Sequence, residues 1–152
     1  MKTVLFAADH AGFALKETLK PYVESLGYTV RDFGALHHED GDDYVDYIAP
    51  LAEAVSKNPD NARGIILGGS GQGEAIVANR FPRVRAAVFY GKQESIPALS
   101  REHNDANILS LGARFITEDE AKKAVKEWLD TPFSGDERHV RRIGKIDQHS
   151  VS

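Results

Sequence analysis

The chain has 152 residues, of which 41% are hydrophobic and 28% charged, and its formal net charge is −4. This length predicts one domain with a sizeable core, and the composition is that of a soluble globular protein. The mild negative charge argues against a nucleic-acid partner, and the absence of cysteine excludes disulfides, thiolate metal sites and thiol nucleophiles. Without a charged-then-apolar leader or a long apolar run, we expect a cytoplasmic protein with no membrane partner.

Short apolar runs alternate with amphipathic helical stretches along the chain. Strands are expected at residues 3–8, 28–33, 64–67, 85–89 and 107–111. Helices are expected at residues 13–26, 46–56, from the end of a glycine loop to 79, and at 95–102, 118–129 and 138–145. This alternation predicts a doubly wound α/β fold, with a five-stranded parallel sheet covered by helices on both faces. Residues 1–152 are expected to form a single domain, with a flexible tail at 147–152.

A glycine-rich loop, residues 68–74 (GGSGQGE), follows the third predicted strand and opens a helix. Backbone N–H groups in such a loop can close on an anion, and the helix N-terminus adds partial positive charge. Glu74 stands where a dinucleotide motif needs glycine and where a P-loop needs lysine, so neither nucleotide fingerprint fits. A carboxylate beside an anion-stabilising loop instead suits a base next to a developing negative charge. The alternative is a tight turn in which Glu74 only complements the helix dipole.

Two polar pairs are further candidates for chemistry. Asp9 and His10 follow the first strand and could bind a sugar hydroxyl or move its proton, although a helix-capping Asp with a bystander His is the alternative. His103 could exchange a proton and Asn104 could bind hydroxyls or an oxyanion, although both also suit the end of a helix. We expect both pairs and the glycine loop beyond the carboxyl ends of the strands, where ligands bind in such sheets.

Two charged segments complete the set of candidates. Residues 138–142 (RHVRR) are basic, and on a helix Arg138 and Arg142 would share a face and could converge on one phosphate. The alternative is a solvated basic helix. Residues 37–43 (HHEDGDD) match no EF-hand spacing, and adjacent histidines seldom chelate one ion. We therefore favour a solvated loop there and predict no metal.

Together these groups supply a phosphate grip, an anion-stabilising loop, one carboxylate base and groups that can move hydroxyl protons. Nothing in the set supplies a hydride, a metal or a covalent nucleophile, so no cofactor is expected. This combination suits proton abstraction next to a carbonyl of a small sugar phosphate, through an enediolate, which is aldose–ketose isomerisation. The rival from another class is a non-catalytic phosphosugar- or nucleotide-binding module, in which a carboxylate in the cradle would serve no purpose.

Several segments resemble ribose-5-phosphate isomerase type B, whose wider family includes galactose-6-phosphate and allose-6-phosphate isomerases. The resemblance runs from about residue 4 to residue 146, and the run 101–107 (REHNDAN) is highly specific. It is also carried by residues 9–12 (DHAG), 15–16 (LK), the glycine loop with 78–79 (AN), 85–87 (RAA), 111–114 (LGAR) and 138–142. It implies a ribose 5-phosphate/ribulose 5-phosphate isomerase and leaves a hexose-6-phosphate isomerase as the alternative.

The resemblance also implies a Rossmann-like α/β/α sandwich that works without a cofactor, as a homodimer or homotetramer with the active site at the dimer interface. Asp9 and His10 would bind substrate, while His103 would come from the partner subunit and help to open the furanose ring as the acid, with Asn104 binding the sugar beside it. The loop residues whose backbone would hold the enediolate oxygens are Gly69, Ser70, Gly71, Gln72 and Gly73. The residues expected at the phosphate are Arg114, Arg138 and Arg142, with His139 nearby.

Two departures from the family pattern matter. Many members carry a catalytic cysteine at the position of Gly68, so the base here cannot be a thiolate; one branch uses a glutamate that matches Glu74. We expect the helix dipole to keep this carboxylate ionised and ready to accept a proton. The second departure is residues 45–49 (VDYIA), where members usually continue with Pro-Asp, so no role is carried over to the preceding loop, although Tyr47 could approach the site.

Overall fold

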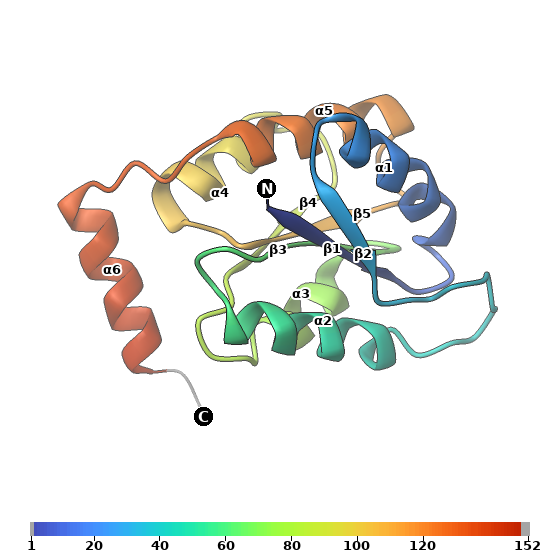
Figure 1. Cartoon of the computed structure of the whole chain (residues 1–152), viewed down its shortest axis with the longest axis horizontal. Coiled ribbons are helices and arrows are strands. Elements are labelled where there is room, and N and C mark those ends of the chain that lie inside the picture. Colours follow the sequence, from blue (N-terminus) through green and yellow to red (C-terminus); the bar gives the residue numbers. More distant parts are fainter. Residues whose placement is uncertain (1, 150–152) are drawn as a thin grey trace.

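The computed structural model describes residues 2–149, in which strands and helices alternate along the chain (Figure 1). The strands are β1 (Thr3–Ala8), β2 (Thr29–Asp32), β3 (Arg63–Gly68), β4 (Ala86–Phe89) and β5 (Ile108–Gly112). The helices are α1 (Phe13–Ser25), α2 (Val45–Lys57), α3 (Gln72–Ala78), α4 (Ile96–Asn104), α5 (Glu118–Asp130) and α6 (Glu137–Gln148). All predicted elements are confirmed.

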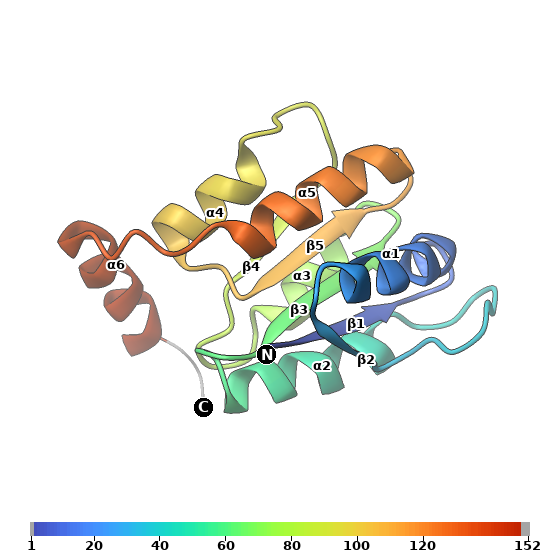
Figure 2. The same ribbon diagram turned by 45° about the horizontal axis from the view of Figure 1, so that its top comes forward.

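The five strands form one parallel sheet in the order β2-β1-β3-β5-β4. Helices α1 and α5 pack on one face, and α2 and α3 pack on the other (Figure 2). Helix α4 packs against α5 and β4. The predicted three-layer α/β/α architecture with a five-stranded parallel sheet is therefore confirmed.

Strand β1 illustrates why the central strands are continuously apolar. Successive side chains point to opposite faces, so Phe6 joins the core under α1 and α5 while Leu5 joins the core against α2. Both faces are covered, and a polar side chain on either would lose its contact with water. On the α5 side, Trp128 is fully buried. A reciprocal capping box between Thr117 and Glu120 begins this helix.

The connections around β1 and β3 form the switch point of the sheet, which is where ligands bind in folds of this kind. From β1 the chain crosses through α1 on one face to β2, and from β3 it crosses through α3 on the opposite face toward β4 (Figure 2). Adjacent strands whose helices leave in opposite directions open a crevice beyond their carboxyl ends. The segment after Ala8 and the glycine loop after Gly68 both lie there.

Helix α6 extends away from the sandwich and packs mainly against α4 (Figure 1). It includes Asp147 and Gln148, the first two residues of the tail that was expected to be flexible, and their flexibility stays a prediction. The helix persists because its backbone hydrogen bonding continues as far as His149, whose amide donates to the Ile146 carbonyl. Residues 150–152 lie outside the described residues. Within residues 2–149, no helix combines the length and apolarity needed to span a membrane.

Candidate active site

The glycine loop is held in place through its carbonyl groups. Gly71 has a left-handed backbone (φ +79°), and the Ser110 hydroxyl donates a 2.7 Å hydrogen bond to its carbonyl. The Arg114 amide donates to the Gly69 carbonyl at 3.1 Å. No residue in the described part of the chain accepts from the backbone amides of Ser70 or Gly71. The loop is therefore fixed by β5 and the turn after it, while these N–H groups remain available to an anion.

Glu74 lies in the first turn of α3 and directs its carboxylate back over Gly68. The residue is only 4% exposed, and a Cβ on Gly68 would lie 2.1–2.2 Å from the carboxyl carbon and both oxygens of Glu74. Burial raises the pKa of Glu74, with a further contribution from the charge of Asp9, and outweighs the lowering effect of its own amide hydrogen bond. Burial thus opposes the stabilisation of the charged form that was expected from the helix dipole, and the ionisation of Glu74 near neutral pH stays a prediction. The raised pKa makes it a stronger base.

Asp9 follows β1 and is buried beside the same crevice. Its Oδ1 accepts hydrogen bonds from the amides of Ala11 at 2.9 Å and Gly12 at 3.3 Å, so it supports the turn into α1. This turn lies tightly against β3, since a Cβ on Gly12 would be 2.6 Å from the Cβ of Leu67. The helix-capping alternative thus accounts for Oδ1 of Asp9 but not for its other carboxylate oxygen. The charge of Asp9 also contributes to the raised pKa of Glu74, so these two buried carboxylates are neighbours.

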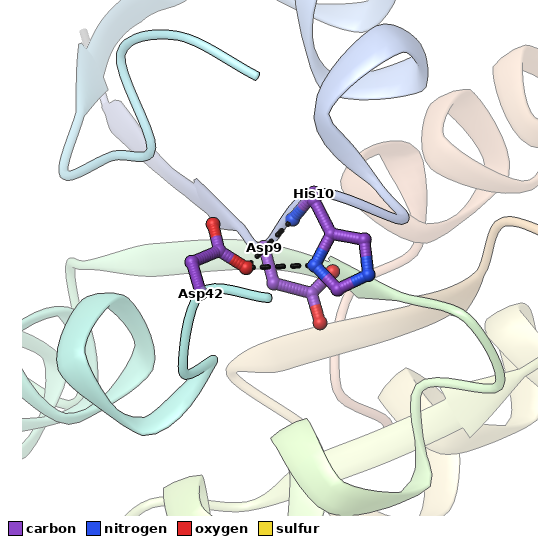
Figure 3. Close-up of side chains that lie close together, drawn as sticks. All are labelled: Asp9, His10 and Asp42. Carbon is purple, nitrogen blue, oxygen red and sulfur yellow. Dashed lines mark hydrogen bonds and ion pairs between the residues drawn. The ribbon is translucent and has the colours of Figure 1, made fainter. Parts of the chain in front are cut away.

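His10 is paired with Asp42, from the loop between β2 and α2 (Figure 3). Asp42 Oδ1 accepts from the backbone amide of His10 at 3.1 Å and lies 2.8 Å from His10 Nδ1. The Asp42 side chain is 4% exposed, whereas that of His10 is 29% exposed. The hydrogen bond to Asp42 is the main reason that the pKa of His10 is raised. The pair orients the imidazole and favours a proton on Nδ1, which leaves Nε2 for a ligand.

Asp9, His10 and Asp42 also form the one group in residues 2–149 whose donor atoms could hold a metal ion, since these atoms lie within 4.8 Å of one another. However, His10 Nδ1 and Asp42 Oδ1 are already bonded to each other, and Asp9 Oδ1 accepts two backbone amides. A metal ion would have to displace these contacts. Hydrogen bonding explains the cluster, and the expectation that no metal binds stays a prediction.

Arg114 and Tyr44 flank the glycine loop. A Cβ on Gly69 would lie 2.8 Å from Nη1 of Arg114, so the guanidinium packs directly against the loop. A Cβ on Gly73 would lie 2.7 Å from the hydroxyl oxygen of Tyr44, the residue immediately before α2. One side chain can offer charge-assisted hydrogen bonds and the other a phenolic hydroxyl.

Tyr47 is not the tyrosine that reaches the glycine loop. Its ring packs against Gly34, where a Cβ would lie 2.7 Å from Tyr47 Cδ1. The two tyrosines lie three positions apart at the start of the same helix, and Tyr44 is the one against the loop. Burial, followed by the charge of Asp42, raises the pKa of Tyr47, so this tyrosine lies beside the partner of His10 while Tyr44 lies against the glycine loop.

His103 and Asn104 lie at the opposite edge of the sheet. They end α4 and precede β5, so they sit at the amino ends of the parallel strands. The expectation that they join the glycine loop at the carboxyl edge is wrong for a single chain, because residues before and after parallel strands occupy opposite edges. His103 instead stacks on His139 of α6, with ring centroids 4.6 Å apart and an interplanar angle of 21°.

His139 is buried, whereas the arginines beside it on α6 are exposed. Burial, followed by the charges of Arg138 and His103, lowers the pKa of His139, and its Nε2 is enclosed without a partner among the described residues. Arg138 and Arg142 are one helical turn apart, as predicted, and neither forms an ion pair within residues 2–149. Figures 1 and 2 both show α6 far from the carboxyl ends of β1 and β3. Within one chain, the expected site residues therefore form two groups, one at the carboxyl ends of the strands and one at the amino ends and on α6.

Residues 4–146 match the model of the Ribose/Galactose Isomerase family. The chain belongs to this family. It is 39% identical over 146 residues to Ribose-5-phosphate isomerase B of Mycobacterium tuberculosis (strain CDC 1551 / Oshkosh), covering 96% of this chain and 88% of the relative.

Solved structures of this isomerase family share the fold. Ribose-5-phosphate Isomerase B from Mycoplasma genitalium with bound ribulose-5-phosphate superposes with a TM-score of 0.92 at 36% identity, covering 97% of this chain and 95% of the other. The Clostridium thermocellum Ribose-5-Phosphate Isomerase B structure gives a TM-score of 0.88 at 40% identity, covering 96% and 95%. These identities and coverages extend the similarity over essentially the whole isomerase domain.

Asp42 and Tyr44 lie in the candidate site, and sequence reasoning missed both of them. Both lie at the end of the polar loop that joins β2 to α2, which the acidic composition had marked as solvated. The one available signal was the tyrosine-containing segment 44–47 at the start of a helix that returns to the crevice. Pairing of Asp42 with His10 spans 32 positions, and no local pattern encodes such a contact.

Proposed function

We propose that this chain interconverts ribose 5-phosphate and ribulose 5-phosphate by proton transfer through an enediolate. The observation that carries the proposal is the buried Glu74 carboxylate, held over Gly68 at the start of the glycine loop with its pKa raised by burial. A phosphate-binding module has no use for a desolvated carboxylate in its anion cradle. Membership of the isomerase family and the ribulose-5-phosphate complex of the Mycoplasma genitalium relative support the same chemistry.

The proposed reaction uses Glu74 as the base. Its carboxylate takes the proton from C2 of the open-chain aldose, the C–H electron pair forms the C1–C2 double bond, and the aldehyde oxygen becomes the enediolate oxygen. The backbone N–H groups of residues 69–73 stabilise that charge. Glu74 then returns the proton to C1, while the proton of the C2 hydroxyl passes to O1, so that C2 becomes the ketone and C1 carries the hydroxyl.

The remaining roles are divided between binding the sugar and opening its ring. Asp9 and His10 bind the sugar hydroxyls, and Asp42 keeps the His10 imidazole oriented with Nε2 toward the ligand. His103 supplies the acid that opens the furanose ring, and Asn104 binds the sugar beside it. The proposed phosphate ligands are Arg114, Arg138 and Arg142, with His139 packed under His103.

The site is proposed to be completed by a second copy of the chain, as a homodimer or a pair of dimers. Within one chain, His103 and the α6 arginines lie at the edge of the sheet opposite Glu74, too far to act on the same small substrate. Helix α6 also exposes Val140 and Ile146, at 52% and 54%, on an element with few neighbours of its own. An amphipathic helix that projects from its own fold can bury this surface on a partner.

Turnover of Glu74→Gln tests the assignment of the base. We expect kcat for ribose 5-phosphate to fall by about 10²–10⁴-fold, the usual contribution of a positioned general base, while KM changes little. Ketose formation from allose 6-phosphate, measured in parallel, determines the preference for pentose or hexose phosphates. Near-normal kcat in the variant would overturn the role of Glu74, and no turnover of any phosphosugar by the parent chain would overturn the function.

A mixing experiment tests the shared site. Glu74→Gln lacks the base, Arg142→Ala lacks a phosphate ligand, and each is expected to be nearly inactive at low substrate concentration. After subunit exchange, half of the dimers are mixed and each mixed dimer has one intact site, so activity should recover to about one quarter of the parent value. A mixture that stays as inactive as its components would show that both residues act within one chain.

A further inference from the structure

A polar cavity of about 360 Å³ lies at the amino edge of the sheet. It is lined by Lys2 before β1, Arg63 at the start of β3, Arg101 of α4 and the segment around Thr131 that follows α5. The glycine loop lies at the carboxyl ends of the same strands. The six-residue strand β1 corresponds to about 20 Å, so this cavity is separate from the crevice that contains Glu74.

The two arginines in this cavity are buried but have unused donors. Arg63 is 8% exposed and donates through Nη1 to the carbonyls of Asp60 and Ala62 at 3.4 and 3.0 Å. No carboxylate in the described part of the chain pairs with it. Arg101 is 5% exposed, and it uses Nε and Nη1 for protein partners. For both arginines, Nη2 has no acceptor among residues 2–149, and this atom remains accessible to solvent.

Positive charge exceeds negative charge around the cavity. The nearby cations are Lys2, Arg63, Arg85 and Arg101, and Asp105 is the carboxylate bonded to them within the described residues, 3.3 Å from Arg85 and 2.8 Å from Arg101. Asp130 at the rim is engaged by Lys126. The charge of Arg63 is the main reason that the pKa of Lys2 is lowered, so these cations repel one another.

We propose that this cavity binds a compact oxyanion of the phosphate class, either inorganic phosphate or the phosphate group of a small metabolite. Guanidinium groups offer paired N–H donors that match phosphate oxygens, and the exposed Lys2 adds an ammonium group to the lining. A bound dianion would remove the repulsion among the cations and supply acceptors for the free Nη2 donors. The local positive field is notable in a chain whose net charge is −4.

The hydrogen bonding of Arg63 distinguishes a ligand site from a cluster whose function is purely structural. Arg101 has a structural explanation, because its hydrogen bonds join α4 to Ala106 and to Thr131 after α5. Among residues 2–149, the Arg63 side chain hydrogen-bonds only to carbonyls of its own preceding turn, and water could satisfy these carbonyls if the side chain were shorter or neutral. Burying the Arg63 guanidinium without a carboxylate partner, beside Arg101 and near Lys2, is unfavourable for folding alone. An anionic ligand gives this placement a physical reason that does not depend on the isomerase activity.

An NMR titration of the full chain tests the proposal at the site itself. Inorganic phosphate and glycerol 2-phosphate are added separately at constant ionic strength, and the backbone amides of Arg63 and Thr131 are followed, with those of Gly71 and Gly73 reporting the glycine loop. We expect saturable shifts at Arg63 and Thr131. If phosphate alone produces them, the ligand is the free ion; if both do, the cavity accepts phosphate monoesters.

Two variants and one control make the result decisive. Arg63→Gln and the exposed Lys2→Gln should each weaken binding at the cavity roughly tenfold or more, while shifts at the glycine loop persist. Arg80→Gln removes the same charge from an exposed position outside the cavity and should leave binding unchanged. Absence of shifts at Arg63 and Thr131, equal shifts with sodium chloride, or undiminished binding in both cavity variants would overturn the proposal.

Discussion

Replacing Gly68 by alanine tests whether the Glu74 carboxylate must occupy its position at the head of the glycine loop. The new methyl group would lie 2.1–2.2 Å from the carboxyl atoms, whereas ordinary contact begins at 3.4 Å. The carboxylate would therefore have to retreat by about 1.3 Å, because the backbone of β3 is held between β1 and β5 and cannot yield as easily. The chemistry of the base is unchanged by this substitution, and only its place is altered.

A displacement of about 1 Å at a reacting group can reduce the rate by roughly 100-fold, equivalent to about 2.7 kcal/mol in the barrier. We expect Gly68→Ala to lower kcat for ribose 5-phosphate by about that factor, with a smaller change in KM because the groups that bind phosphate are not moved. Steady-state assays of aldose-to-ketose conversion give both constants, and thermal unfolding shows whether the variant remains folded.

Gly64→Ala provides the matched control on the same strand. Its methyl group would lie 2.8 Å from Leu51 Cδ2 and 3.1 Å from Ile108 Cγ1, so it strains the core without approaching Glu74. Overpacking of this kind costs about 1–3 kcal/mol of stability, and kcat should be preserved below the melting temperature. If Gly68→Ala retains parent-like kcat, or if both variants lose kcat equally, the reasoning from carboxylate position is refuted.

Three further predictions concern the same crevice. Asp42→Asn should lower the pKa of His10, because the hydrogen bond to Asp42 is the main cause of its elevation; histidine NMR titration measures this, Asp43→Asn is the control, and an unmoved titration would exclude the pairing. Burial raises the pKa of Glu74, so the charged form opposes folding and the parent loses stability as pH rises through that value. Glu74→Gln should therefore raise Tm at alkaline pH but not below about pH 4, and equal Tm differences at both pH values would contradict this sign. Finally, Gly68→Cys combined with Glu74→Ala should regain part of the turnover lost by Glu74→Ala alone; iodoacetamide should abolish it without affecting the cysteine-free parent, and a double variant no faster than Glu74→Ala would count against the shared position of the two bases.

The architecture was predictable from the sequence because the relevant signals are local. Continuous apolar runs such as Ile65–Leu67 have the pattern of strands buried on both faces, and the helix over 118–130 begins with a capping sequence that needs no distant partner. Glycine at position 71 likewise predicts a left-handed turn that only a few residue types adopt readily. Each of these features is determined within a window of about one element.

The site was predictable only where its residues follow strands. Asp9, His10 and Glu74 could be placed because carboxyl ends of parallel strands share one edge. The pairing of His10 with Asp42 depends on the path of a polar loop through space, and no periodicity specifies it. The burial that dominates the pKa of Glu74 also depends on side chains brought from elsewhere in the sequence, whereas helix position alone suggested the dipole.

One steric constraint connects the absence of cysteine, the glycine at position 68 and the glutamate at position 74. A side chain at position 68 and the carboxylate of Glu74 cannot occupy that volume together, because even a methyl group there would overlap the carboxyl atoms. A base supplied from β3 and a base supplied from α3 are therefore mutually exclusive solutions to the same geometric requirement. In this chain position 68 has no side chain, and the carboxylate of Glu74, from the first turn of α3, occupies the free space. It lies beside N–H groups that can stabilise the enediolate. The proposed assignment of Glu74 as the base thus rests on packing as much as on acid–base chemistry.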